Sequence, residues 1–116
     1  MNQFDGKVAL ITGGGGSIGR ATALLFAQAG ADIAVVDLDL TKAQRVTAEV
    51  ESLGRRACAL QADVAQAEDC ARMVADSVAV LGRLNFLFNN AGIGGVNVPL
   101  TELGVEDWDR LLSINL

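Results

Sequence analysis

A run of glycines between an apolar segment and a helix-forming segment is the first feature of this sequence that could do chemistry. Residues 13–19 read Gly-Gly-Gly-Gly-Ser-Ile-Gly; the apolar run 7–12 precedes them and an Ala- and Leu-rich stretch follows. Glycines at such a turn let the backbone approach a pyrophosphate closely, and the free N–H groups at the helix N-terminus then bind the anion. Gly14, Gly16 and Gly19 satisfy the pattern G-x-G-x-x-G, but a glycine run fits several registers. A merely flexible turn is the alternative.

An acidic residue, Asp37, ends the next apolar run, at residues 32–37. A carboxylate at this place accepts hydrogen bonds from the ribose hydroxyls of an adenosine and repels a 2′-phosphate. No cation is expected close by to offset that repulsion, because Lys42 falls inside the next predicted helix. The glycine run and Asp37 together predict binding of NAD(H) in preference to NADP(H). An exposed aspartate in a turn is the alternative for Asp37.

The elements that must position these residues alternate between strand and helix. Continuous apolar runs predict buried parallel strands at residues 7–12, 32–37, 56–61 and 84–88. Helical spacing predicts helices at 18–29, at 66–81 and from about 105 to 116; Thr41 is expected to cap a further helix that ends at Gly54. This order predicts an α/β fold of the Rossmann type, a three-layer α/β/α arrangement with a parallel sheet of strand order 3-2-1-4. Right-handed crossovers would place the first two helices on one face and the last two on the other.

Composition restricts the classes of function. The chain has 116 residues, which corresponds to one domain, and a net charge of −5 with scattered Lys and Arg, which argues against nucleic acid as a partner. Residues 1–7 do not resemble a targeting signal, and no apolar run is long enough for a membrane span. Cys58 and Cys70 are interpreted as small buried side chains in a reducing compartment, so a cytoplasmic location is expected. No set of metal ligands is predicted.

Four motifs in a fixed order resemble the short-chain dehydrogenase/reductase (SDR) family. Its cofactor loop reads T-G-x-x-x-G-x-G, and residues 12–19 match it except that Ser17 takes the place of the middle glycine. Asp63-Val64, after the third strand, look like the family's adenine-contacting pair. Residues 89–92 match its N-N-A-G signature, and residues 113–116 resemble the x-x-N-L segment of the following helix.

The resemblance implies roles for individual residues. Asn115 would belong to a catalytic tetrad of Asn, Ser, Tyr and Lys, in which it helps to hold a water in a proton relay; a surface helix Asn is the alternative. Asp63 could instead begin a helix, Asn90 would have a partly structural role, and the Ser17 hydroxyl could contact phosphate. The expected cofactor-binding residues are Gly13, Gly16, Ser17, Ile18, Gly19, Asp37, Asp63, Val64, Asn90, Ala91 and Gly92.

The family's catalytic Ser and its Tyr-x-x-x-Lys would lie on elements after residue 116. Hydride transfer to or from an alcohol carbon requires a proton to move at the oxygen, and a Tyr can serve if its pKa is lowered from about 10. This sequence has no Tyr and no His. Residues 1–116 are therefore expected to be an incomplete NAD(P)-binding domain, truncated after the fourth strand and its helix and inactive alone.

The expected full-length protein is an NAD-dependent oxidoreductase that acts on an alcohol or ketone and forms homo-oligomers. A non-catalytic nucleotide-binding module and a truncated subunit that pairs with full-length ones are the alternatives.

Overall fold

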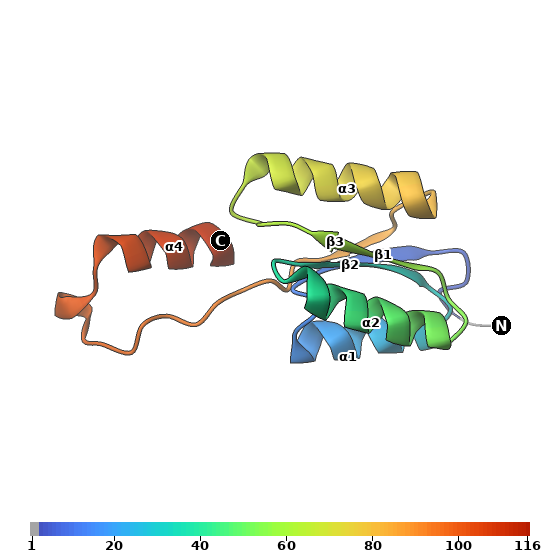
Figure 1. Cartoon of the computed structure of the whole chain (residues 1–116), viewed down its shortest axis with the longest axis horizontal. Helices are drawn as coiled ribbons and strands as arrows, with labels where there is room; N and C mark the ends of the chain where they lie inside the picture. Colours follow the sequence, from blue (N-terminus) through green and yellow to red (C-terminus); the bar gives the residue numbers. More distant parts are fainter. Residues whose placement is uncertain (1–2) are drawn as a thin grey trace.

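The computed structural model describes residues 3–116 and confirms the predicted order of strands and helices (Figure 1). Met1 and Asn2, part of the segment considered above as a targeting signal, lie outside the described residues. The elements are β1 (Val8–Thr12), α1 (Ser17–Gln28), β2 (Asp32–Asp37), α2 (Leu40–Ser52), β3 (Ala57–Gln61), α3 (Ala67–Leu81), β4 (Phe86–Phe88), the short 3₁₀ helix η1 (Leu100–Glu102) and α4 (Val105–Asn115).

The four strands form one parallel sheet in the order β3-β2-β1-β4, as predicted. The central strand β1 pairs with β2 from Val8↔Asp32 to Thr12↔Val36, and with β4 at Ala9↔Phe86. Because all strands run in the same direction, their carboxyl ends lie at one edge of the sheet. That edge brings together the glycine run, Asp37 and residues 89–92.

Helices cover both faces of the sheet, which explains why the strands are almost continuously apolar. Figure 1 shows α1 and α2 on one face and α3 on the other. Alternate residues of β1 and β2 enter two cores: Ile11 and Val35 pack with the α1/α2 side, and Leu10 and Val36 pack with the α3 side. All four of these side chains are fully buried. Burial of both faces makes this sheet a rigid platform for its carboxyl edge.

Several element boundaries differ from the prediction, and at two of them the difference changes the hydrogen bonding. Asp39, not Thr41, caps α2, because its carboxylate Oδ1 accepts the backbone N–H groups of Thr41 at 3.0 Å and of Lys42 at 3.3 Å. Strand β4 begins at Phe86 rather than at residue 84, and Asn85 bonds β1 partly through its side chain. Its Oδ1 accepts the Val8 N–H at 2.9 Å.

The last helix does not cover the sheet, so the expectation that it would share a face with α3 is wrong for this chain. Figure 1 shows α4 apart from the sheet, and within the described residues it packs against no strand and no other helix. Residues 89–104 lead to it, and its contacts are with that segment. Trp108, in the first turn of α4, is 46% exposed.

The two cysteines are free and only partly buried, whereas the prediction had them buried. Burial raises the pKa of the Cys58 thiol, and the negative charge of Asp76 adds to the increase. The Cys70 thiol donates to the Val64 carbonyl at 3.3 Å. Across residues 3–116, no helix combines the length and apolar character needed to cross a bilayer.

Candidate functional site

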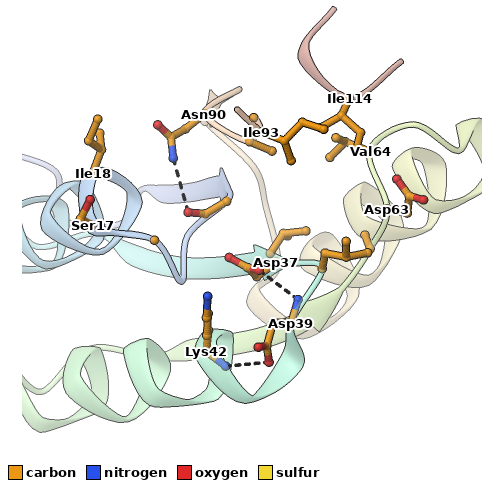
Figure 2. Close-up of a pocket in the computed structure, with 17 residues that line it drawn as sticks. Ser17, Ile18, Asp37, Asp39, Lys42, Asp63, Val64, Asn90, Ile93 and Ile114 are labelled. Carbon is orange, nitrogen blue, oxygen red and sulfur yellow. Dashed lines mark hydrogen bonds between the residues drawn. The ribbon is translucent and has the colours of Figure 1, made fainter. Parts of the chain in front are cut away.

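A cavity of about 540 Å³ opens at the carboxyl edge of the sheet, a volume typical of small-molecule and cofactor sites (Figure 2). Ten of the eleven predicted cofactor-binding residues line it; Gly19 does not, and neither does the predicted catalytic residue Asn115. The structure therefore brings together the motifs that are distant in sequence. The lining residues are Gly13, Gly16, Ser17, Ile18, Val36, Asp37, Leu38, Asp39, Lys42, Ala62, Asp63, Val64, Asn90, Ala91, Gly92, Ile93 and Ile114.

The N-terminus of α1 supplies unpaired donors at the wall of this cavity. Gly16 is the N-cap and offers no side-chain acceptor, and the first turn contains no acidic residue. In the part of the chain that the structure describes, the backbone N–H groups of Ser17, Ile18 and Gly19 have no acceptor. Orphan N–H groups and the positive end of the helix dipole make such a terminus an anion site. Oxygens of a phosphate would satisfy these donors.

The glycine run itself contributes fewer donors than its sequence suggests. The Gly14 N–H donates to the Val36 carbonyl at 2.9 Å, and the Gly16 N–H donates to the Gly13 carbonyl at 3.1 Å. The Gly15 N–H donates to Asp37 Oδ2 at 3.0 Å. These bonds shape the turn, so the donors available to a ligand lie in the first turn of α1.

Gly19 acts through packing rather than by lining the cavity. A Cβ at this position would overlap the Gly13 carbonyl oxygen and lie 2.7 Å from the Gly14 Cα. Only glycine therefore lets α1 approach the preceding turn this closely. Ser17, in contrast, is exposed. The serine that replaces the family's middle glycine has room for its hydroxyl.

Thr12 is a buried hydroxyl that connects the glycine run to residues 89–92. Its Oγ1 accepts the N–H groups of Asn90 at 3.0 Å and Ala91 at 3.1 Å, and it donates to the Phe88 carbonyl at 3.4 Å. This uses the one donor and two acceptor positions of a hydroxyl. The Asn90 side chain adds a bond from Nδ2 to the Gly13 carbonyl at 3.4 Å. Thr12 thereby fixes one wall of the cavity, a role that the sequence analysis did not assign.

Asp37 lies in the cavity wall at the end of β2, where the sequence placed it, but a cation lies close to it. Lys42 lines the same cavity, and Figure 2 shows its side chain rising from α2 beside Asp37. The expectation that no cation is close by is therefore wrong. The reason is that α2 begins at Leu40 and its first turn faces the glycine run, so a residue inside the helix still reaches the site.

Asp63 and Val64 line the cavity from the segment between β3 and α3. The Asp63 Oδ1 accepts the Ala65 N–H at 3.0 Å, while the Asp63 N–H donates to Asp69 Oδ2 at 2.8 Å. This N–H bond, followed by a bond from Arg72, lowers the pKa of Asp69. Gln66, not Asp63, is the N-cap of α3. Asp63 therefore organises the turn before the helix and remains at the cavity wall.

The Asn115 side chain is bonded to the backbone of Ile93. Its Oδ1 accepts the Ile93 N–H at 2.8 Å, and its Nδ2 donates to the Ile93 carbonyl at 3.0 Å. This pair of bonds, here called the Asn115 clasp, joins α4 to the loop that borders the cavity. It explains a polar amide among the apolar residues of this helix. In this structure the side chain positions a loop, and a direct catalytic role for Asn115 stays a prediction.

Sequence reasoning missed several lining residues, among them Leu38, Lys42, Ile93 and Ile114. Thr12 carried a visible signal, because it is the only polar residue between Val8 and Gly13. The four lining residues gave none, since apolar residues in loops or helices, such as Leu38, Ile93 and Ile114, and a helical lysine such as Lys42 are common in all proteins. Within residues 3–116 no group of three His, Cys, Asp or Glu side chains is arranged to hold a metal ion.

Comparison with known proteins agrees with this geometry. The chain is 45% identical to cyclohexanol dehydrogenase of Acinetobacter sp. (strain SE19), covering 99% of this chain and 46% of that protein. It is 41% identical to tropinone reductase-like 1 of Erythroxylum coca, covering 98% of this chain and 42% of that protein. The chain thus spans less than half the length of these relatives.

Solved structures show the same fold. An NAD⁺-bound xylitol dehydrogenase superposes with a TM-score of 0.92 at 38% identity, covering 99% of this chain and 44% of the other. A 3-ketoacyl-(acyl-carrier-protein) reductase from Brucella melitensis, in complex with NADH, superposes with a TM-score of 0.88 at 35% identity, over 98% and 46% of the two chains. A family model described as short chain dehydrogenase matches residues 7–116. This protein therefore belongs to the short-chain dehydrogenase family.

Proposed function

We propose that these 116 residues are the NAD(H)-binding part of an oxidoreductase that interconverts an alcohol and a carbonyl compound. The observation that carries the proposal is the single cavity that joins the unpaired N–H groups of α1 to the carboxylate of Asp37. Those two features match the two polar parts of the cofactor that lie nearest its adenine, the pyrophosphate and the adenosine ribose.

The residues present fit the cofactor along its length. The N–H groups of Ser17 and Ile18 would hold the pyrophosphate, and Asp37 would accept the ribose hydroxyls. Asp63 and Val64 would flank the adenine. Asn90, Ala91 and Gly92 would border the nicotinamide half, where Thr12 holds the backbone of the first two in place. The bound cofactor would supply hydride transfer, and the chain's own contribution is to bind and orient it.

A preference for NAD(H) over NADP(H) is part of the proposal. The Asp37 carboxylate would repel the 2′-phosphate, while Lys42 on the other side offsets part of that repulsion. In this proposal the Asp37 carboxylate lies nearer to the ribose than the Lys42 ammonium does, because Asp37 ends the strand whose carboxyl edge forms the cavity wall. The net effect favours the unphosphorylated ribose.

Isothermal titration calorimetry of the 116-residue chain with NAD⁺ and NADP⁺ tests the proposal directly. Tighter binding of NAD⁺ is expected, and Asp37→Ala should narrow the gap between the two cofactors by about 1–2 kcal/mol, the scale of one hydrogen bond to a charged group. Asp5→Ala is a matched control that also removes a carboxylate, outside the cavity. Equal or tighter binding of NADP⁺ by the unmodified chain would contradict the assigned role of Asp37.

Turnover needs groups that these residues do not provide. The sequence has no Tyr and no His, and the Asn115 amide has no titratable proton. By the family resemblance, the Ser, Tyr and Lys of the active site and most of the substrate pocket belong to segments outside these 116 residues. The identity of the alcohol or ketone would be determined there. A nucleotide-binding module without catalysis is the second candidate function, and the cavity with the unpaired N–H groups of α1 supports nucleotide binding in either case.

Location and assembly complete the proposal. The free thiols of Cys58 and Cys70 fit a reducing compartment, which supports the cytoplasm. The exposed edge strand β4, with Leu87 47% and Phe88 39% exposed, supports assembly into homo-oligomers.

A further inference from the structure

The backbone of Gly15 and the carboxylate of Asp37 form a direct bond between two parts of the cavity wall. The Gly15 N–H donates to Asp37 Oδ2 at 3.0 Å. The second carboxylate oxygen, Oδ1, accepts the N–H of Asp39 at 2.9 Å. Each carboxylate oxygen therefore accepts one backbone N–H. One donor, Gly15, precedes Asp37 in the sequence, and the other, Asp39, follows it. This arrangement fixes the plane of the carboxylate.

The space around Gly15 leaves no room for a side chain. A Cβ at this position would lie 2.5 Å from the Lys42 Cβ, 2.9 Å from Asp37 Oδ2 and 3.1 Å from the Lys42 carbonyl carbon. The φ angle of Gly15 is not in the left-handed region, so a side chain is excluded by contact and not by backbone strain. Any side chain here must displace either the carboxylate or the first turn of α2.

The two backbone hydrogen bonds leave each carboxylate oxygen of Asp37 with one free acceptor position. A carboxylate oxygen offers about two lone-pair positions, and one position on each oxygen is used by backbone. One remains on each oxygen, and Asp37 lines the cavity. Two neighbouring acceptors suit a vicinal diol, whose two hydroxyls each donate a proton. A phosphate monoester at neutral pH offers negative charge instead.

We infer that Gly15 is a positioning residue for cofactor discrimination: its N–H orients Asp37 so that the carboxylate accepts both ribose hydroxyls and faces any 2′-phosphate. This inference rests on the proposed function and adds to it a residue that does not line the cavity and was not among the predicted binding residues. Gly15 would affect the choice between the two cofactors through Asp37, without touching either cofactor.

The test compares binding of ADP-ribose and 2′-phospho-ADP-ribose, which lack the nicotinamide and so report on this half of the site alone. Gly15→Ala should weaken binding of ADP-ribose by about tenfold or more, the value of one charge-assisted hydrogen bond. Binding of the 2′-phosphorylated ligand should change less, so the ratio of the two dissociation constants should shrink. Gly94→Ala is the matched control, because a Cβ at Gly94 meets nothing within 4 Å.

A ratio that stays unchanged in Gly15→Ala, whether or not both ligands bind more weakly, would overturn the inference and leave Gly15 a purely structural role. Failure of the unmodified chain to bind ADP-ribose would instead overturn the proposed function, and the inference with it. The two failures are therefore distinguishable.

A second measurement does not depend on the folding of Gly15→Ala. Amide hydrogen exchange should show the Gly15 N–H protected in the unmodified chain and exposed in Asp37→Ala. The neighbouring Gly14 N–H, bonded to the Val36 carbonyl, should stay protected in both and serves as an internal reference. Equal protection of Gly15 in the two proteins would overturn the inference, because Asp37 would then not be its acceptor.

Discussion

Replacing Thr12 by Val removes a hydroxyl and keeps the volume and branching of the side chain. Thr12 is 2% exposed, and its hydroxyl accepts two backbone N–H groups and donates to one carbonyl. Leaving a buried donor without an acceptor costs about 1–3 kcal/mol. The donors on Asn90 and Ala91 are only partly buried, so water reaches them in part. Two donors lose their acceptor, and partial hydration keeps the cost of each near the lower end of that range. We therefore expect Thr12→Val to lower the free energy of unfolding by about 2–3 kcal/mol in total.

The assay is equilibrium unfolding in urea at neutral pH, with the slope m compared between proteins to check that the unfolding reaction is the same. Thr12→Ser retains the hydroxyl and loses one buried methyl group, which costs about 1 kcal/mol. Thr22→Val is the matched surface control, because the Thr22 hydroxyl is exposed and bonds only to its own helix, at the Ile18 carbonyl. Its effect should lie within about 0.5 kcal/mol.

A Thr12→Val protein as stable as Thr12→Ser would refute the reasoning, because the hydroxyl would then contribute nothing that the methyl groups do not. The variant should also bind NAD⁺ more weakly, since the backbone of residues 90–91, which borders the proposed nicotinamide half, loses its anchor.

Four further outcomes are expected. Lys42→Met should weaken binding of NADP⁺ more than that of NAD⁺ in calorimetry, because it removes the cation that offsets Asp37; an equal loss for both would contradict this. Asp69→Asn should lower the urea midpoint at neutral pH. The difference in urea midpoint between the two proteins should disappear as the pH falls from 3.8, the ordinary pKa of an aspartate, through the lowered pKa of Asp69. The reason is that a carboxylate with a depressed pKa stabilises the fold only while it is charged. The isolated chain should self-associate through β4, whose edge is unpaired and apolar; sedimentation of a clean monomer at high concentration would count against it. The 116-residue chain should show no turnover of alcohols or ketones when nicotinamide absorbance is followed, and activity that disappears in Asn115→Ala would reveal an unrecognised catalytic site.

The strands and the strand order could be predicted because a parallel sheet covered on both faces requires continuous apolar runs, and few other structures do. Val8 to Ile11 and Ile33 to Val36 are such runs, and each is fully or almost fully buried. The glycine run and Asp37 could be placed at one edge for the same reason. Once the strands are parallel, the segments that follow them must meet.

The parts that could not be predicted depend on where helices begin and which loops lie side by side. Asp39 and Thr41 are both good capping residues, and sequence alone does not show which one the chain uses. The place of Lys42 at the cavity follows from that choice. The partners of Thr12 lie 76 to 79 residues away, so its role appears only in the fold. The position of α4 could not be inferred from helix–sheet alternation, because a helix that packs on no strand satisfies the same pattern.

The pairing of the first strand with the last has a consequence for the order of events during synthesis. β1 lies between β2 and β4, and its Ala9 cannot pair with Phe86 until Phe86 has been synthesised. The rings of Phe4 and Phe26 also gain the contact with the Phe86 ring only then. The Phe86 ring centroid lies 5.1 Å from that of Phe4 and 5.7 Å from that of Phe26. The 24 residues from 62 to 85 separate the end of β3 from the start of β4, and a ribosome needs roughly one to five seconds to add them. For that interval the nascent chain can join three strands but must leave one side of its central strand open, so this is the period in which a chaperone would be most useful.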